Sequence, residues 1–184
     1  MINTPLSRAL GAAAVALILS SPAFAAGAHS GGHGGGAATG APGKASAVTR
    51  TIEVVMHDTY YEPESIEVKP GETIRFKIRN AGEFVHEFNI GTADMHLAHQ
   101  PEMQMMVDMN VLLPDRIDLA AGKAMQASMG HGMHDEPNSA LLAPGKSAEM
   151  IWTFPKQAGA AIEFGCNVPG HYGSGMVGDF LMDQ

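Results

Sequence analysis

The sequence predicts an all-β fold in which two antiparallel sheets pack as a sandwich. Polar and apolar side chains alternate along short segments, and Gly, Pro and Asn residues separate one segment from the next. Alternation with a period of two is typical of strands that bury one face, and short strands at this spacing favour a two-sheet sandwich. A closed barrel is the alternative that the same pattern allows.

Several segments carry this strand pattern. The clearest covers residues 73–79, which alternate without a break between the turn residues Pro70-Gly71 and Asn80-Ala81-Gly82. All of the predicted strands lie between residues 51 and 184, a common size for a single domain. The other predicted strands cover residues 51–56, 65–69, 85–90, 147–154, 161–165 and 177–182.

Residues 1–25 have the parts of a secretory signal. Arg8 lies near the start, residues 10–19 form an apolar run, and Ala23-Phe24-Ala25 is a small-x-small cleavage pattern. The apolar run is short for a membrane span, which argues against the alternative of a retained anchor. We therefore expect cleavage near Ala25, a periplasmic product, and no attachment to the membrane afterwards.

The mature chain is predicted to begin with a flexible tail and to be acidic. Residues 26–50 are mostly Gly, Ala and Ser with His29 and His33, a composition that buries too little apolar surface to order itself. Loss of Arg8 leaves 10 Lys and Arg against 19 Asp and Glu, a net charge of −9. This acidity argues against a nucleic-acid partner, and we expect a soluble monomer.

Cys166, His171 and Met176 lie within one short segment of soft donors. Cys166 is the single cysteine of a chain predicted to enter an oxidising compartment, where the alternative to a ligand is a buried, inert thiol. A thiolate, an imidazole and a thioether suit copper, and a second imidazole would complete the ligand set of a type 1 copper site. His86 is the best candidate for it, because an antiparallel sheet can bring its strand next to the loop.

Two other chemistries use Cys and His. Zinc is the second metal to consider, but structural zinc sites usually have more thiolates, and Met is not a usual zinc ligand. A Cys-His hydrolase would need an orienting Asn or Asp and an oxyanion hole, and nothing in the sequence singles these out.

The pattern Cys166-x4-His171-x4-Met176 resembles the C-terminal copper loop of the cupredoxins, with a spacing closest to rusticyanin. The element Asn80-x-Gly82-x-x-x-His86 resembles the same family. The signal, the acidic charge and a Met/His-rich insertion are similar to those of the periplasmic CopI-type copper-tolerance cupredoxins. The resemblance implies a Greek-key β-sandwich and a copper ion that cycles between Cu(II) and Cu(I).

One residue departs from the resemblance. Glu87 follows the first ligand histidine, where several cupredoxins have a neutral hydrogen-bonding residue. Neighbours of this kind tune the cysteine sulfur and the reduction potential. The resemblance therefore leaves both the potential and the colour of the site, blue or green, open.

Residues 92–142 form a long insertion in which the strand pattern breaks down. Residues 101–109 are predicted as a short helix, because Pro suits a first helical turn. Residues 111–113 and 116–119 are predicted as a strand or a buried connector, and residues 122–138 as irregular.

The insertion is also rich in Met and His. Thioethers favour Cu(I), and imidazole accepts either copper state, so a second copper site is predicted here. Its candidate ligands are Met129, His131, Met133, His134, Met95, His96 and His99. For Met103, Met106 and Met109 the alternative is that they pack a helix on the sandwich. His29 and His33 are candidates for a weak site in the tail.

Three functions follow from these features. A copper-tolerance protein is favoured, because a simple carrier has no evident need for extra soft ligands. The alternative is a dedicated electron carrier that exchanges electrons with a periplasmic redox protein through the edge of His171, which in cupredoxins is the exposed ligand. We expect no enzymatic activity, with a small oxidase that turns over Cu(I) as the third hypothesis.

Overall fold

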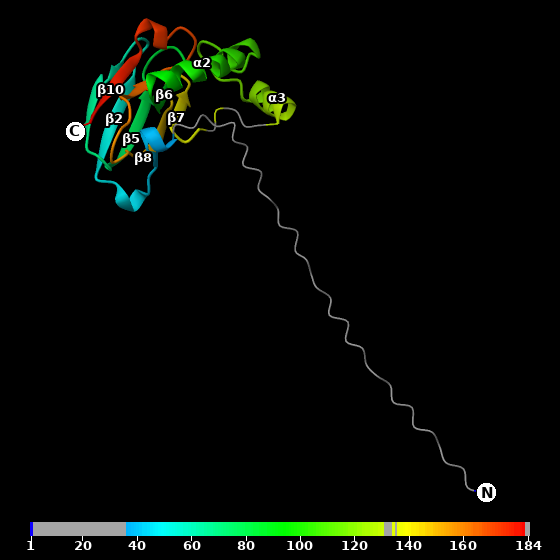
Figure 1. The fold of residues 1–184 in the computed structure, drawn as a ribbon. Coiled ribbons are helices and arrows are strands. Elements are labelled where there is room, and N and C mark those ends of the chain that lie inside the picture. The colour runs from blue at the N-terminus through cyan, green and yellow to red at the C-terminus, as the bar shows by residue number, and fades with distance from the viewer. Residues whose placement is uncertain (2–35, 131–133, 135, 183–184) are drawn as a thin grey trace. The chain divides into compact units, whose positions relative to one another are not determined.

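The computed structural model describes Met1 and residues 36–130, 134 and 136–182. The predicted signal, apart from Met1, lies outside the described residues, as do His29, His33, His131 and Met133. From residue 36 onward, the described residues form two five-stranded sheets with two longer helices beside them (Figure 1). The predicted all-β sandwich is confirmed.

The first sheet has the strand order β1-β8-β5-β2-β3. Its two longest pairings join β5 to β8 in antiparallel and β5 to β2 in parallel orientation. β2 and β5 run parallel because the chain crosses into the other sheet between them, which the simple antiparallel prediction missed. The five strands are β1 (Ala41–Pro42), β2 (Arg50–Met56), β3 (Tyr61–Glu62), β5 (Thr73–Asn80) and β8 (Ser147–Thr153).

The second sheet has the strand order β4-β10-β9-β6-β7 and carries the candidate site. β6 lies between β9 and β7, antiparallel to both, and every one of its residues is buried. β10 pairs with β4 in parallel orientation. The five strands are β4 (Ser65–Val68), β6 (His86–Gly91), β7 (Ser139–Leu142), β9 (Ile162–Gly165) and β10 (Val177–Met182).

The sandwich core lies between the two sheets. Ile74, Phe76 and Ile78 alternate along β5 and are fully buried, as the period of two predicts. The ring of Phe88 packs against Phe164, with centroids 5.4 Å apart. Cys166 and Met176 belong to the same apolar cluster, so one end of the core continues directly into the candidate site.

The insertion differs from the prediction in two places. Helix α2 covers Ala93–Asp108, eight residues longer at its start than predicted, because the Thr92 side chain caps it by accepting the Met95 N–H at 3.3 Å. Pro101 lies inside this helix and not in its first turn. Helix α3 covers Leu119–Met129, where most residues were predicted to be irregular. An isolated antiparallel bridge joins Leu112 and Ile117 between the helices, in line with a buried connector.

The two helices have a small apolar core of their own. Met103 and Met106 of α2 are fully buried, and Met125 of α3 is 3% exposed. They pack with Val85, Val111 and Leu112 in a second cluster beside the sandwich. For Met103 and Met106 the structure therefore favours packing, whereas Met109 is 40% exposed.

Part of the segment predicted as a flexible tail has ordered contacts. Residues 36–50 include the short helix α1 (Gly36–Thr39), β1 and the 3-10 helix η1 (Ala45–Ala47). The indole N–H of the buried Trp152 donates to the Thr39 carbonyl oxygen at 2.9 Å, which satisfies a donor that would otherwise be buried alone. Among the described residues, no helix has the length and apolar character needed to cross a membrane.

Candidate metal centre

The pairing of β6 with β9 brings His86 and Cys166 together. β9 ends at Gly165, which lies opposite Asn89 of β6, and Cys166 follows as the chain leaves the sheet. Because the two strands are antiparallel, the exit from β9 lies beside the first residues of β6. His86 is the first residue of that strand.

Two imidazole nitrogens converge on one buried sulfur. His171 Nδ1 lies 3.3 Å from Cys166 Sγ, and His86 Nδ1 lies 3.9 Å from it. The two rings have centroids 5.0 Å apart. Cys166 and His86 are fully buried, whereas His171 is partly exposed. Three of the four residues predicted as ligands thus present their donor atoms to one point.

Met176, the fourth predicted ligand, is held next to Cys166 by the backbone of the loop. The Cys166 N–H donates to the Met176 carbonyl oxygen, and the Met176 N–H donates to that of His171, both at 3.1 Å. The chain reverses direction around η2 (Tyr172–Ser174), where Gly175 has a φ of 93° that favours glycine. Met176 is 1% exposed, so its thioether is buried at the same end of the core.

Asp58 orients His86. Its Oδ1 lies 3.1 Å from His86 Nε2, which leaves Nδ1 directed at the sulfur. The same oxygen accepts the Glu83 N–H at 2.7 Å. Gly82 leaves the space that Asp58 Oδ1 needs for both contacts, since a Cβ at residue 82 would lie 2.1 Å from that oxygen. Sequence reasoning did not find Asp58, because only the folded turn shows that it faces His86 across 28 residues.

The protonation states of the three donors fit metal binding. Burial lowers the pKa of His86, although Asp58 acts in the opposite direction, and burial and the neighbouring His86 lower the pKa of His171. Both imidazoles are therefore neutral near pH 7 and can act as ligands. Burial raises the pKa of the Cys166 thiol to about 12, so a metal ion would have to displace its proton.

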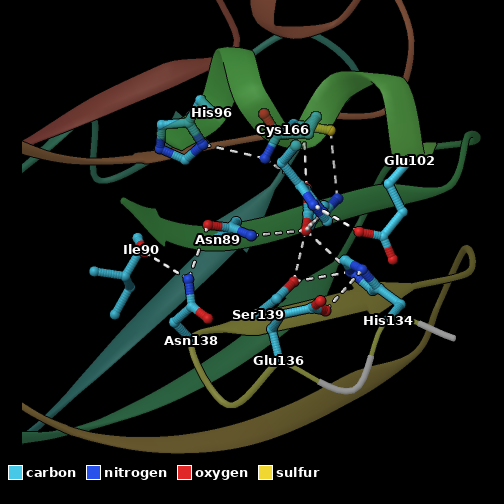
Figure 2. Close-up of polar contacts among 12 residues, drawn as sticks. Asn89, Ile90, His96, Glu102, His134, Glu136, Asn138, Ser139 and Cys166 are labelled. Atoms are coloured by element: carbon cyan, nitrogen blue, oxygen red, sulfur yellow. Dashed lines mark hydrogen bonds and ion pairs between the residues drawn. The ribbon is translucent and has the colours of Figure 1, made fainter. Parts of the chain in front are cut away.

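Glu87 joins this site to a second polar cluster. Figure 2 shows Cys166 of the first site together with His134 and Ser139 of this cluster. Its backbone N–H donates to Cys166 Sγ at 3.3 Å, and its carboxylate accepts the backbone and side-chain N–H groups of Asn167 at 3.0 and 2.9 Å. Burial raises the pKa of Glu87, but contacts with His134 and His99 outweigh that effect and hold it well below its usual value. A fully buried carboxylate here is thus ionised and compensated by histidines.

The other predicted ligands of the insertion lie in different surroundings. His96 is buried, stacks on Tyr172 with centroids 5.2 Å apart, and its Nδ1 lies 3.1 Å from Asn167 Nδ2. Met129 is 38% exposed at the end of α3, and Met95 is half-buried in the first turn of α2. Of the predicted histidines, His99 and His134 meet at one point, together with Glu87.

The donor set at Cys166 fits copper. A buried thiol and two neutral imidazoles with a neighbouring buried thioether are soft donors of the kind that copper prefers. The carboxylate behind His86 is the type of outer partner that fixes the orientation of a metal-bound imidazole.

Comparisons with known proteins agree with this fold. A family model for the Cupredoxin-like domain matches residues 10–96. Two solved structures are similar in fold: the dithionite-reduced auracyanin of Roseiflexus castenholzii, at 23% identity and a TM-score of 0.50, and auracyanin B, at 20% and 0.53. The matches cover 74% of this chain and 99% of the first protein, and 79% and 97% for the second.

Two further relatives are more similar in sequence than these structures. The copper-resistant cuproprotein CopI of Pseudomonas aeruginosa is 45% identical over 155 residues, covering 79% of this chain and 82% of that protein. The protein of the same description from Rubrivivax gelatinosus is 36% identical over 158 residues, covering 84% and 81%. These relatives match over most of both chains, and the chain therefore belongs to the family of copper-resistant CopI cuproproteins, with a cupredoxin-like fold.

Proposed function

We propose that this protein is a periplasmic type 1 copper protein that acts in copper tolerance. The observation that carries the proposal is the convergence of His86 Nδ1 and His171 Nδ1 on the buried sulfur of Cys166. His86, Cys166, His171 and Met176 would hold the copper ion. When bound, the ion would supply reversible one-electron redox chemistry between Cu(II) and Cu(I).

The surroundings of these four residues support a preorganised site. Asp58 holds the His86 ring, the loop backbone holds Met176 beside Cys166, and the Glu87 N–H is directed at the sulfur. A rigid frame of this kind keeps the ligands in place when the charge of the ion changes, because little rearrangement is needed.

A role in tolerance is supported by the relatives and by the charge of the chain. Two CopI proteins described as copper-resistant are 45% and 36% identical to this chain over 155 and 158 matched residues. The predicted signal favours export, and an acidic mature chain favours cationic partners. Copper ions would then be both the resident cofactor and the cargo that the protein handles.

An electron carrier is the second candidate function. His171 is partly exposed, whereas His86 and Cys166 are fully buried. The edge of the His171 ring therefore offers the shortest route from the proposed copper site to a redox partner at the surface.

Deletion of the gene separates the two functions. We expect the deletion strain to grow normally in ordinary medium and poorly in excess copper, and the wild-type gene to restore growth. A Cys166→Ser gene should fail to restore it, while a control His57→Gln gene, altered at a half-buried histidine that pairs with Glu62, should succeed. Normal growth in excess copper together with a respiratory defect would reject tolerance in favour of the carrier.

A further inference from the structure

Glu87, His99 and His134 form a second cluster of metal-ligand type next to the first. Glu87 Oε1 lies 3.0 Å from His134 Nε2 and 3.4 Å from His99 Nε2. The two imidazole rings face each other with centroids 5.2 Å apart and planes within 19°. Glu87 lies on β6, His99 on α2 and His134 in the segment before β7. At this point the insertion therefore packs against the sheet.

We propose that Glu87, His99 and His134 bind a second divalent metal ion, copper(II) in this protein. Two ligand atoms bound at about 2.0 Å to one ion lie about 2.8 Å apart at a right angle and about 3.3 Å apart at a tetrahedral angle. The distances from Glu87 Oε1 to the two imidazole nitrogens, 3.0 and 3.4 Å, are slightly longer than these values.

A carboxylate near the second ring nitrogen of each histidine is an independent observation that supports a metal site. His99 Nδ1 lies 3.4 Å from Glu102 Oε2, and His134 Nδ1 lies 3.6 Å from Glu136 Oε2. Metal-bound histidines usually direct their second nitrogen at a carboxylate or carbonyl oxygen, which fixes the tautomer and orients the ring. His99 thus has a carboxylate on its far side and Glu87 on its near side. His134 also lies between two carboxylates, but its Nδ1 and Glu136 Oε2 are too far apart for a hydrogen bond.

Burial and an unpaired imidazole nitrogen also point to a ligand. The side chains of Glu87, His99 and His134 are 0%, 8% and 6% exposed. His99 Nε2 is buried without a hydrogen bond to any described residue, and its atom faces Glu87. Ser139 Oγ lies 2.6 Å from Glu87 Oε1 and 2.9 Å from His134 Nε2, so a hydroxyl adjoins the same point (Figure 2). Asn89 Nδ2 also donates to Glu87 Oε1, at 3.1 Å.

Two imidazoles and a carboxylate define the class of metal. Nitrogen and oxygen donors without a thiolate suit divalent first-row ions, and copper(II) binds most tightly among them. The choice of copper rests on the proposed function, whereas the site itself rests only on its three side chains. Without a thiolate, bound copper(II) would lack the intense charge-transfer colour of the first site, which allows the two sites to be followed separately.

A titration of the mature chain with Cu(II) tests the proposal. We expect the visible absorption of the first site to saturate at one equivalent, and a second, weakly coloured copper signal to appear by electron paramagnetic resonance with coupling to two nitrogens. His99→Gln and His134→Gln should each lower the copper affinity of the second site, measured from this signal, at least tenfold. Both variants should keep the visible absorption, which shows that the fold and the first site are intact.

Matched variants test whether other histidines give rise to the second signal. His57→Gln, and the double variant His29→Gln with His33→Gln, should keep the second signal. The proposal is overturned if the second signal survives in His99→Gln and His134→Gln, or if it disappears in the tail variant. Loss of the visible absorption alone would count against the proposed function and not against this site.

Crystals of the wild-type chain grown with two equivalents of copper provide a test that needs no substitution. We expect an anomalous scattering peak between Glu87, His99 and His134. This measurement decides the question if the histidine variants fail to fold. The absence of a peak there, in crystals that show one beside Cys166, would overturn the proposal.

Discussion

The backbone N–H of Glu87 donates to the sulfur of Cys166 at 3.3 Å, while the carboxylate of the same residue lies between His99 and His134. One residue of β6 thus contacts both candidate sites through different atoms. A neutral N–H directed at a thiolate spreads its charge and favours the reduced state of a bound metal. The acidic side chain contacts both regions as well: Oε2 accepts from Asn167, which follows Cys166, and Oε1 lies beside His99 and His134.

Asp58 is predicted to control copper affinity without contacting the ion. Asp58→Ala removes the oxygen that lies 3.1 Å from His86 Nε2, so the ring loses its fixed orientation. Loss of such an outer partner typically costs 10- to 100-fold in metal affinity, and we expect about that change. Competition with a copper chelator measures it. Asp115→Ala is the control, because Asp115 is exposed and pairs with Arg116. Equal affinity of the two variants would contradict the orienting role.

Gly82 is predicted to be irreplaceable for a steric reason. In Gly82→Ala the new Cβ would lie 2.1 Å from Asp58 Oδ1 and 2.9 Å from His86 Nε2, so one of these side chains must move. We expect weaker copper binding and a changed visible spectrum. Gly159→Ala is the matched control, since nothing lies within 4 Å of a Cβ at that position. A Gly82→Ala protein with the wild-type spectrum and affinity would show that the Asp58–His86 contact has no functional effect.

Met176→Leu is predicted to keep copper bound but to raise the reduction potential. The substitution conserves the volume of a buried side chain and removes one weak donor. A thioether is a soft ligand that suits Cu(I), but the loss of any donor costs the more highly charged Cu(II) more than Cu(I). Protein-film voltammetry measures the potential, and the visible spectrum should shift in the same sample. An unchanged potential and spectrum would mean that Met176 is not a ligand.

Glu72 is predicted to make stability depend on pH. Burial raises the pKa of Glu72, but hydrogen bonds from Arg50, the Lys69 N–H and Thr49 lower it below the usual 4.5. The ionised carboxylate therefore stabilises the fold above pH 4.5, and this contribution is lost as the pH falls through the lowered pKa. The pair is partly exposed, so we expect Glu72→Gln to cost about 1 kcal/mol or less at pH 7.

Urea unfolding of the metal-free protein checks this prediction. The difference between wild type and Glu72→Gln should be present at about pH 7 and vanish at about pH 2. Glu149→Gln serves as a control on the same sheet, because Glu149 is 55% exposed in its pair with Arg75. A difference that grows toward low pH would contradict the sign of the effect.

Alternation and loop spacing were sufficient to predict the sandwich and the residues that converge on Cys166. β5 and β10 follow the predicted ranges to within one residue, because each buries one face against the opposite sheet. The proposed copper loop is local in sequence, so its Cys, His and Met could be recognised together. His86 was predicted from the rule that antiparallel strands bring distant ends side by side, together with the resemblance of Asn80-x-Gly82-x-x-x-His86 to the cupredoxins.

The insertion was harder to predict, since tertiary contacts decide its structure. Helix α3 contains Gly122, which lowers helix propensity, yet Asp118 caps its start and Gly130 ends it in a left-handed conformation. The meeting of Glu87 with His134 joins residues 47 positions apart through the packing of the insertion. No local pattern in the sequence shows which histidine compensates which carboxylate.

The visible spectrum of the mature protein with one equivalent of Cu(II) tests the central claim most directly. If Cys166 binds copper together with His86 and His171, an intense thiolate-to-copper absorption should appear and saturate at one equivalent. Cys166→Ser should abolish it, because a hydroxyl cannot replace the thiolate as the source of that transition. A Cys166→Ser protein that keeps the absorption would contradict the assignment.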